Sequence, residues 1–175
     1  MRTHKSFHTR LKLSKVTTSG YALLEVLLGS FILVTGVVSL GIGLMQAQRS
    51  QKEAHLIHLA NRATLSKVEE MRGANFSTLL INYSTGGTPG PDFDVPDLLA
   101  RTDDPDGKVG KIEFVTNETI PHAQLGLPRD LNGNEDSVDT DISGNYRFLP
   151  TIITINYQGY NGNQEFKFYV LLAKR

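Results

Sequence analysis

The sequence predicts an α+β protein with a long N-terminal helix and a small antiparallel β-sheet. The first half of the helix is expected to span a membrane, and its second half to pack against the sheet. Two observations favour this fold. An uncharged apolar run, residues 26 to 45, precedes a stretch of good helix formers without Pro or Gly. Alternating apolar segments then follow in the C-terminal third of the chain.

The apolar run is long enough to cross a bilayer as a helix. A hydrocarbon core about 30 Å thick needs roughly 20 residues at about 1.5 Å each. Glu25 stands just inside the start of the run, where an unpaired carboxylate would cost several kcal/mol. We therefore expect Glu25 to have a partner.

The residues around this glutamate form a recognisable pattern. Gly20 is followed by the aromatic Tyr21, by three apolar residues, by Glu25 and then by the apolar helix. This pattern resembles the N-terminal processing signal of type IV pilins and pseudopilins. The resemblance implies that a prepilin peptidase and methyltransferase cuts between Gly20 and Tyr21 and methylates the new N-terminus. It also implies that Glu25 meets the N-terminal amine of a neighbouring pilin or pseudopilin subunit.

Two positions depart from the family pattern. The first mature residue is most often Phe, and Tyr21 keeps the ring but adds a hydroxyl. Many pilins carry a helix-breaking Pro where this sequence has Ile42, flanked by Gly41 and Gly43. Local weakening of the helix would then depend on glycine.

Residues 1 to 20, the expected leader, carry basic side chains and no acidic ones. The positive-inside rule predicts a cytoplasmic N-terminus and an exported remainder, although Arg49, Lys52 and Arg62 weaken the contrast. A secretory signal or an organellar transit peptide is the alternative, but a secretory apolar core has only about 7 to 15 residues. Together with this orientation, the resemblance to pilins implies a single-pass protein of a bacterial inner membrane that becomes part of a periplasmic or cell-surface filament.

The net charge of the chain bears on which class of partner it could bind. The sequence has 18 basic and 18 acidic residues; removing the five basic residues of the leader leaves 13 and 18, a net charge of −5. A mildly acidic chain without a cluster of Lys and Arg argues against nucleic acid as a partner. The absence of cysteine excludes disulfides and thiolate metal sites.

The pattern of residues 46 to 73 predicts an amphipathic, extracytoplasmic continuation of the helix that ends at Gly73. Apolar and small residues spaced by three and four form a stripe on which a sheet could pack. The stripe contains Ile57, Ala60, Thr64, Val68 and Met71.

Residues 74 to 175 are expected to form an extracytoplasmic β-sheet domain. Gly and Pro punctuate residues 76 to 110 and exclude long helices, and residues 111 to 115 predict a strand. Residues 146 to 157 and 166 to 172 predict an antiparallel hairpin. One face, with Phe166, Phe168 and Val170, is expected on the helix, and the other, with Lys167 and Tyr169, in solvent.

An acidic loop, residues 130 to 141, resembles EF-hand and dockerin-type calcium loops. Oxygen-bearing side chains occupy positions 1, 3, 5 and 12 of twelve, the spacing with which such a loop wraps a hard cation. Glu135 replaces the usual Gly of the tight turn. A solvated turn is the alternative, but its carboxylates would repel one another without a cation. The expected calcium ligands are Asp130, Asn132, Asn134, Asp136 and Asp141.

The resemblance implies a structural subunit, a minor pilin or pseudopilin of a type IV pilus or a type II secretion pseudopilus. A membrane-anchored, calcium-dependent binding module that does not polymerise is the alternative. We do not expect an enzyme, because the sequence has no cysteine nucleophile, Gly-x-Ser-x-Gly, His-Glu-x-x-His or phosphate-loop motif.

Overall fold

The computed structural model describes residues 19 to 174, so residues 1 to 18 of the expected leader lie outside the described residues. The chain divides into two compact units, one ending at Ala47 and the other beginning at Gln48. Helix α1 (Ser19–Gly73) runs through both units. Each unit is described by itself.

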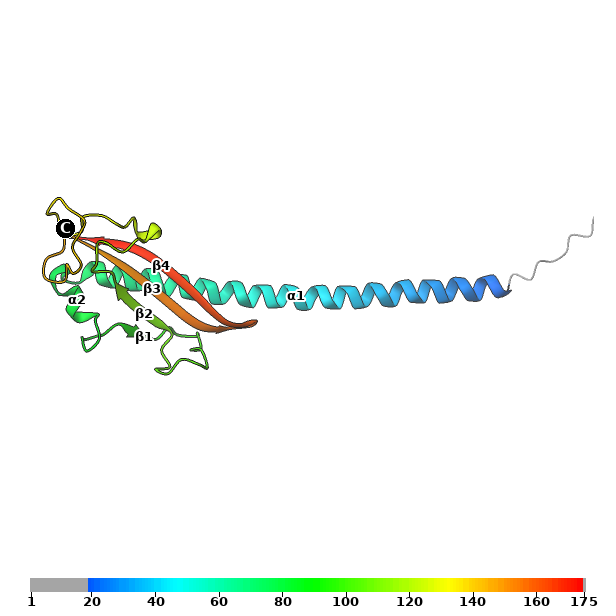
Figure 1. The fold of residues 1–175 in the computed structure, drawn as a ribbon. Coiled ribbons are helices and arrows are strands. Elements are labelled where there is room, and N and C mark those ends of the chain that lie inside the picture. The colour runs from blue at the N-terminus through cyan, green and yellow to red at the C-terminus, as the bar shows by residue number, and fades with distance from the viewer. Residues whose placement is uncertain (1–18, 175) are drawn as a thin grey trace, which may run out of the picture. The chain divides into compact units, whose positions relative to one another are not determined.

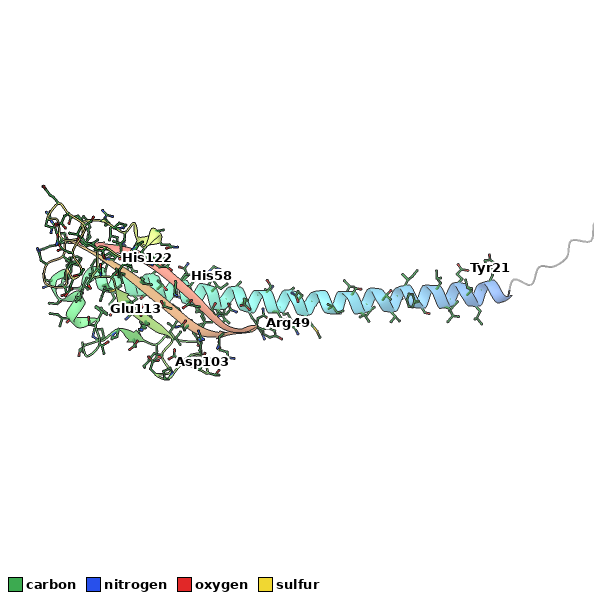
Figure 2. The ribbon with its side chains drawn as sticks, in the orientation of Figure 1. Tyr21, Arg49, His58, Asp103, Glu113 and His122 are labelled. Atoms are coloured by element: carbon green, nitrogen blue, oxygen red, sulfur yellow. The ribbon has the colours of Figure 1, made fainter. Side chains whose placement is uncertain are left out.

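The first unit contains the apolar part of α1. Side chains from Tyr21 onward are exposed on every side of this helix (Figure 2). The hydroxyls of Ser30, Thr35 and Ser39 donate to carbonyls three or four residues earlier, at 2.8 to 2.9 Å, so the helix itself satisfies its internal hydroxyl groups. Helix α1 is therefore long and apolar enough to cross a membrane.

In the second unit, the later part of α1 is amphipathic as predicted, except at Ile57. The prediction is wrong there: Ile57 is exposed, and its neighbour Leu56 packs against the core instead. The buried side chains of this part of α1 include Ala60, Thr64, Val68 and Met71, at spacings of three and four. The buried hydroxyl of Thr64 donates to the carbonyl of Ala60 at 2.8 Å. The helix ends at Gly73, as expected.

Short elements follow α1: a 3₁₀ turn η1 (Phe76–Thr78), helix α2 (Leu79–Asn82) and, further along the chain, a 3₁₀ turn η2 (Ala123–Leu125). The tyrosine that follows α2 ties this region to α1, because the hydroxyl of Tyr83 donates to Glu70 at 2.8 Å.

The sheet has four antiparallel strands in the order β1-β2-β3-β4 (Figure 1). The strands are β1 (Asp92–Phe93), β2 (Gly110–Phe114), β3 (Phe148–Gly159) and β4 (Gly162–Ala173). The predicted hairpin is confirmed: β3 and β4 pair along their whole length and close with Gly159 opposite Gly162. This leaves a two-residue loop of Tyr160 and Asn161.

The main core lies between α1 and one face of the sheet. Alternate residues of β3 point to this face, as the period of two requires. Leu149, Ile153 and Ile155 are completely buried there and belong to one cluster with the apolar stripe of α1. The predicted α+β fold is thus confirmed.

The prediction for the other face of the hairpin is wrong at Tyr169. The chain between β2 and β3 covers part of this face and forms a second apolar cluster. Tyr169 and Ile152, which are cross-strand partners, both pack against that cluster. Tyrosine is compatible with either environment because its apolar ring can be buried while its hydroxyl stays near water. Lys167 is exposed, as expected. The second cluster is built from Leu125, Leu127, Leu131 and Ile142.

Candidate processing segment and cation site

The three residues of the expected processing signal lie at the start of α1. The backbone at Gly20 is helical. Tyr21 is exposed (Figure 2), and so is Glu25. Because Tyr21 and Glu25 are four residues apart, they share one face of the helix. Within residues 19 to 174, no ion pair includes Glu25. The partner expected for this carboxylate is therefore not among these residues.

Three acidic side chains meet in the second unit. One carboxylate oxygen from each of Glu118, Asp136 and Asp139 lies within 4.8 Å of the other two. Glu118 is completely buried, Asp139 is half-buried and Asp136 is exposed. This cluster could hold a metal ion.

Two backbone hydrogen bonds place Glu118 next to the acidic loop. The N–H of Glu118 donates to the carbonyl of Asp139, and the N–H of Ile142 donates to the carbonyl of Thr116, both at 2.9 Å. They pair the segment after β2 with the end of the acidic loop. Glu118 is thereby placed beside carboxylates that are far from it in the sequence.

The two oxygens of Glu118 have different surroundings. Oε1 accepts a hydrogen bond from the N–H of Leu131 at 2.6 Å. Oε2 is buried, and no donor within the described residues reaches it. A buried carboxylate oxygen without a donor is unfavourable unless a cation or water meets it.

Of the five expected calcium ligands, the structure places Asp136 in the cluster and two asparagines beside it. The side-chain amides of Asn132 and Asn134 donate to Oδ2 of Asp139 at 2.7 and 2.9 Å. These contacts hold Asp139 in place and leave the amide oxygens directed at backbone N–H groups of the loop.

The other two expected ligands, Asp130 and Asp141, accept hydrogen bonds from residues that lie two to five positions later in the chain. Asp130 accepts from the N–H groups of Gly133 and Glu135, and Asp141 accepts from the N–H and hydroxyl of Ser143 at 2.9 and 3.1 Å. The backbone N–H of Ser143 is the main cause that lowers the pKa of Asp141 below its ordinary value. The structure does not bring Asp130 or Asp141 into the three-carboxylate cluster.

The tight turn expected at position 6 of the loop is present in spite of its residue type. Glu135 has a φ of 76°, in the left-handed region that usually takes glycine. The N–H of Glu135 donates to Asp130 at 2.9 Å, which helps to hold this conformation.

Sequence reasoning missed Glu118 as a candidate ligand. Glu118 stands between Asn117 and Thr119, outside the 130 to 141 loop, and no spacing motif connects it to that loop. Only the backbone pairing of residues 116 to 118 with residues 139 to 142, which is a feature of the folded chain, identifies Glu118 as a candidate ligand.

No protein-family model, curated protein or solved structure matches this chain. A functional assignment therefore depends on the N-terminal pattern and on the geometry of the described residues. These residues provide one helix that could cross a membrane and one acidic cluster that could hold a metal ion.

Proposed function

We propose that the chain is a structural subunit of a pilin-like filament, a minor pilin or pseudopilin of a bacterial type IV pilus or type II secretion pseudopilus. One observation carries the proposal. The Gly20, Tyr21 and Glu25 pattern stands at the start of an apolar helical segment, residues 21 to 47, whose side chains are exposed on all sides. Such a helix needs lipid or other helices around it.

Processing would follow from the position of the Gly20–Tyr21 bond, directly before the apolar segment. A prepilin peptidase and methyltransferase would remove the basic leader and methylate the amine of Tyr21. The chain would then be a single-pass protein of the inner membrane with a cytoplasmic N-terminus, and after assembly a part of a periplasmic or cell-surface filament.

Assembly would depend on Glu25. Its carboxylate is the only charge between Tyr21 and Gln48 apart from a new amine at Tyr21, and the ion pairs of the described residues do not include it. In apolar surroundings an unpaired carboxylate is costly, and an amine of a neighbouring subunit would offset that cost through a charge-assisted hydrogen bond.

Small residues on one side of the helix would help neighbouring helices to approach. Thr35, Ser39 and Gly43 recur every four residues and therefore lie on one face. The two hydroxyls are bonded within α1, so close packing would not leave them unsatisfied.

The acidic cluster favours a second candidate, a membrane-anchored, calcium-dependent binding module that does not polymerise. Calcium is the cation we propose, because carboxylate oxygens in a flexible loop suit its large and variable coordination shell better than the strict octahedron of magnesium. Both candidates accommodate such a site, so only processing and assembly separate them.

Replacing Glu25 tests the filament proposal. We expect Glu25→Ala to leave membrane insertion intact, because loss of a charge favours insertion, and to abolish incorporation into filaments. Glu25→Asp should be intermediate. Immunoblots of membranes and of sheared filaments, from cells in which the variant replaces the natural chain, measure both quantities.

Ser30→Ala is the matched control, since Ser30 also lies in the apolar segment but donates only to the carbonyl of Leu27 in its own helix. This variant should assemble normally. Filaments that contain Glu25→Ala at the wild-type level would show that Glu25 is not the assembly contact.

A further inference from the structure

The buried oxygen of Glu118 is a polar group that the proposed filament function does not use. Its side chain is completely buried, yet Oε2 has no donor among the described residues. Ionised carboxylates are rarely buried in this way unless a positive charge is close. The ion pairs of residues 19 to 174 do not include Glu118, Asp136 or Asp139, so no Lys or Arg of these residues supplies that charge.

The spacing of the three carboxylates suits a single ion. Calcium binds oxygens at about 2.3 to 2.6 Å, so two ligands of one ion are at most about 5 Å apart. The three oxygens lie within 4.8 Å of one another. Without an ion, three like charges at this separation repel one another, and burial of Glu118 strengthens the repulsion.

We propose that Glu118, Asp136 and Asp139 together bind one hard divalent cation, of which calcium is the best fit, with Oε2 of Glu118 as the buried ligand. The site is built from two separate segments, the segment after β2 that carries Glu118 and the acidic loop, and differs from a self-contained twelve-residue loop. It stands independently of the filament function.

The cation would hold the second apolar cluster together. Glu118 binds the N–H of Leu131 through its other oxygen, and Leu131 is completely buried in that cluster. The segment that carries Glu118 is also bonded to Ile142 of the same cluster through Thr116. Binding would therefore stabilise the whole covering of the second sheet face, because it favours only the folded arrangement.

Full-length protein in detergent micelles provides the test. After treatment with EDTA, wild type should bind one calcium ion per chain in isothermal titration calorimetry. It should also melt several degrees higher when calcium is present at a hundredfold excess over Kd. Glu118→Gln keeps the shape of the side chain but removes its charge. Substitutions outside the ligand shell already weaken metal binding about 10- to 100-fold, so we expect at least a tenfold weaker Kd here.

Asp141→Asn is the matched control, because Asp141 is an expected ligand of a self-contained loop but contacts Ser143 in the structure. Its Kd should equal that of wild type. In EDTA, Glu118→Gln should melt no lower than wild type, since the repulsion among the carboxylates is reduced. If Glu118→Gln does not fold, Asp136→Asn replaces an exposed ligand and should also weaken calcium binding at least tenfold.

Three results would overturn the proposal. Wild type could melt identically in calcium and in EDTA without heat of binding. Asp141→Asn could lose calcium while Glu118→Gln retains it, which would place the ion in the loop alone. Asp136→Asn could bind calcium as wild type does.

Discussion

The carboxylates of residues 130 to 141 have two different roles at the scale of single residues. Carboxylate oxygens of Asp136 and Asp139 lie close to one of Glu118, whereas the carboxylate of Asp130 accepts hydrogen bonds from backbone N–H groups of the loop. Partial desolvation acts to raise the pKa of Asp130, but N–H groups of Glu135, Gly133 and their neighbours outweigh it and lower the pKa below its ordinary value. The ionised form of Asp130 is therefore favoured in the folded state.

This direction predicts a pH dependence. Because the folded-state pKa of Asp130 is lowered, its contribution to stability is present above about pH 4, the ordinary pKa of Asp, and is lost as the pH falls through the folded-state pKa. Asp130→Asn should melt below wild type at pH 7, and the two melting temperatures should converge toward pH 2. Thermal unfolding in EDTA, followed by circular dichroism, measures the difference. An equal difference at both pH values would contradict this role of Asp130.

The candidate cation site could be predicted from the sequence only in part, for reasons visible at single residues. Asp136 and the two asparagines belong to a local run of polar residues, so a spacing argument finds them. Glu118 lies outside that run and is brought in by long-range backbone hydrogen bonds, which no local pattern encodes. Asp130 and Asp141 fit the spacing but bond to nearby N–H groups, because Asp readily accepts from the backbone two or more residues later.

At the scale of elements, local periodicity predicted the helix and the hairpin well. The α1 stripe and the β3–β4 pairing depend on neighbours in sequence, so the periods of 3.6 and 2 reveal them. The second face of the sheet depends on where a long connection returns. Leu125, Leu127 and Leu131 gave no regular period in the sequence, and their packing against Tyr169 therefore could not be predicted.

The position of the Phe93 side chain on β2 depends on one glycine. Phe93 lies opposite Gly110, and a Cβ at Gly110 would come within 2.3 Å of the Phe93 ring. The ammonium nitrogen Nζ of Lys67, on α1, lies over the same ring at 4.9 Å from its centre, in a cation–π contact. The absence of a side chain at Gly110 thus allows Phe93 to lie across the strand and contact the helix.

Gly110→Ala should therefore destabilise the domain by about 1 to 3 kcal/mol, the usual cost of overpacking. Gly144→Ala is the control, because no heavy atom of the described residues, apart from those of Gly144 and its two chain neighbours, lies within 4 Å of a Cβ at that position. Its effect should remain within about 0.5 kcal/mol. Urea unfolding of the two variants in EDTA measures both values, and equal stability would contradict the close packing of Phe93 on Gly110.

At the scale of the whole molecule, the two units are suited to different surroundings. Side chains of the first unit are apolar and exposed, which suits lipid or a bundle of helices. The second unit has its own cores, built on the later part of α1 and the sheet. The membrane-spanning capacity of α1 and the α+β fold could be read from composition and periodicity, whereas the identity of any partner subunit is not encoded in either.

The filament account requires cleavage before the apolar helix, and Gly20→Val tests this requirement. A β-branched side chain beside the scissile bond should obstruct the peptidase, since Gly20 presents no side chain to it. We expect this variant to accumulate as an unassembled precursor that still carries the leader. A normal mature mass in the variant would show that Gly20 does not define the cleavage site.

The mature N-terminus tests the central claim most directly. Intact-mass and N-terminal peptide mass spectrometry of the membrane-extracted wild-type protein measure it without any substitution. The account predicts a chain that begins at Tyr21 and carries one N-methyl group. A membrane-bound chain that retains Met1 and the basic leader would contradict the account and favour an anchored module that does not polymerise.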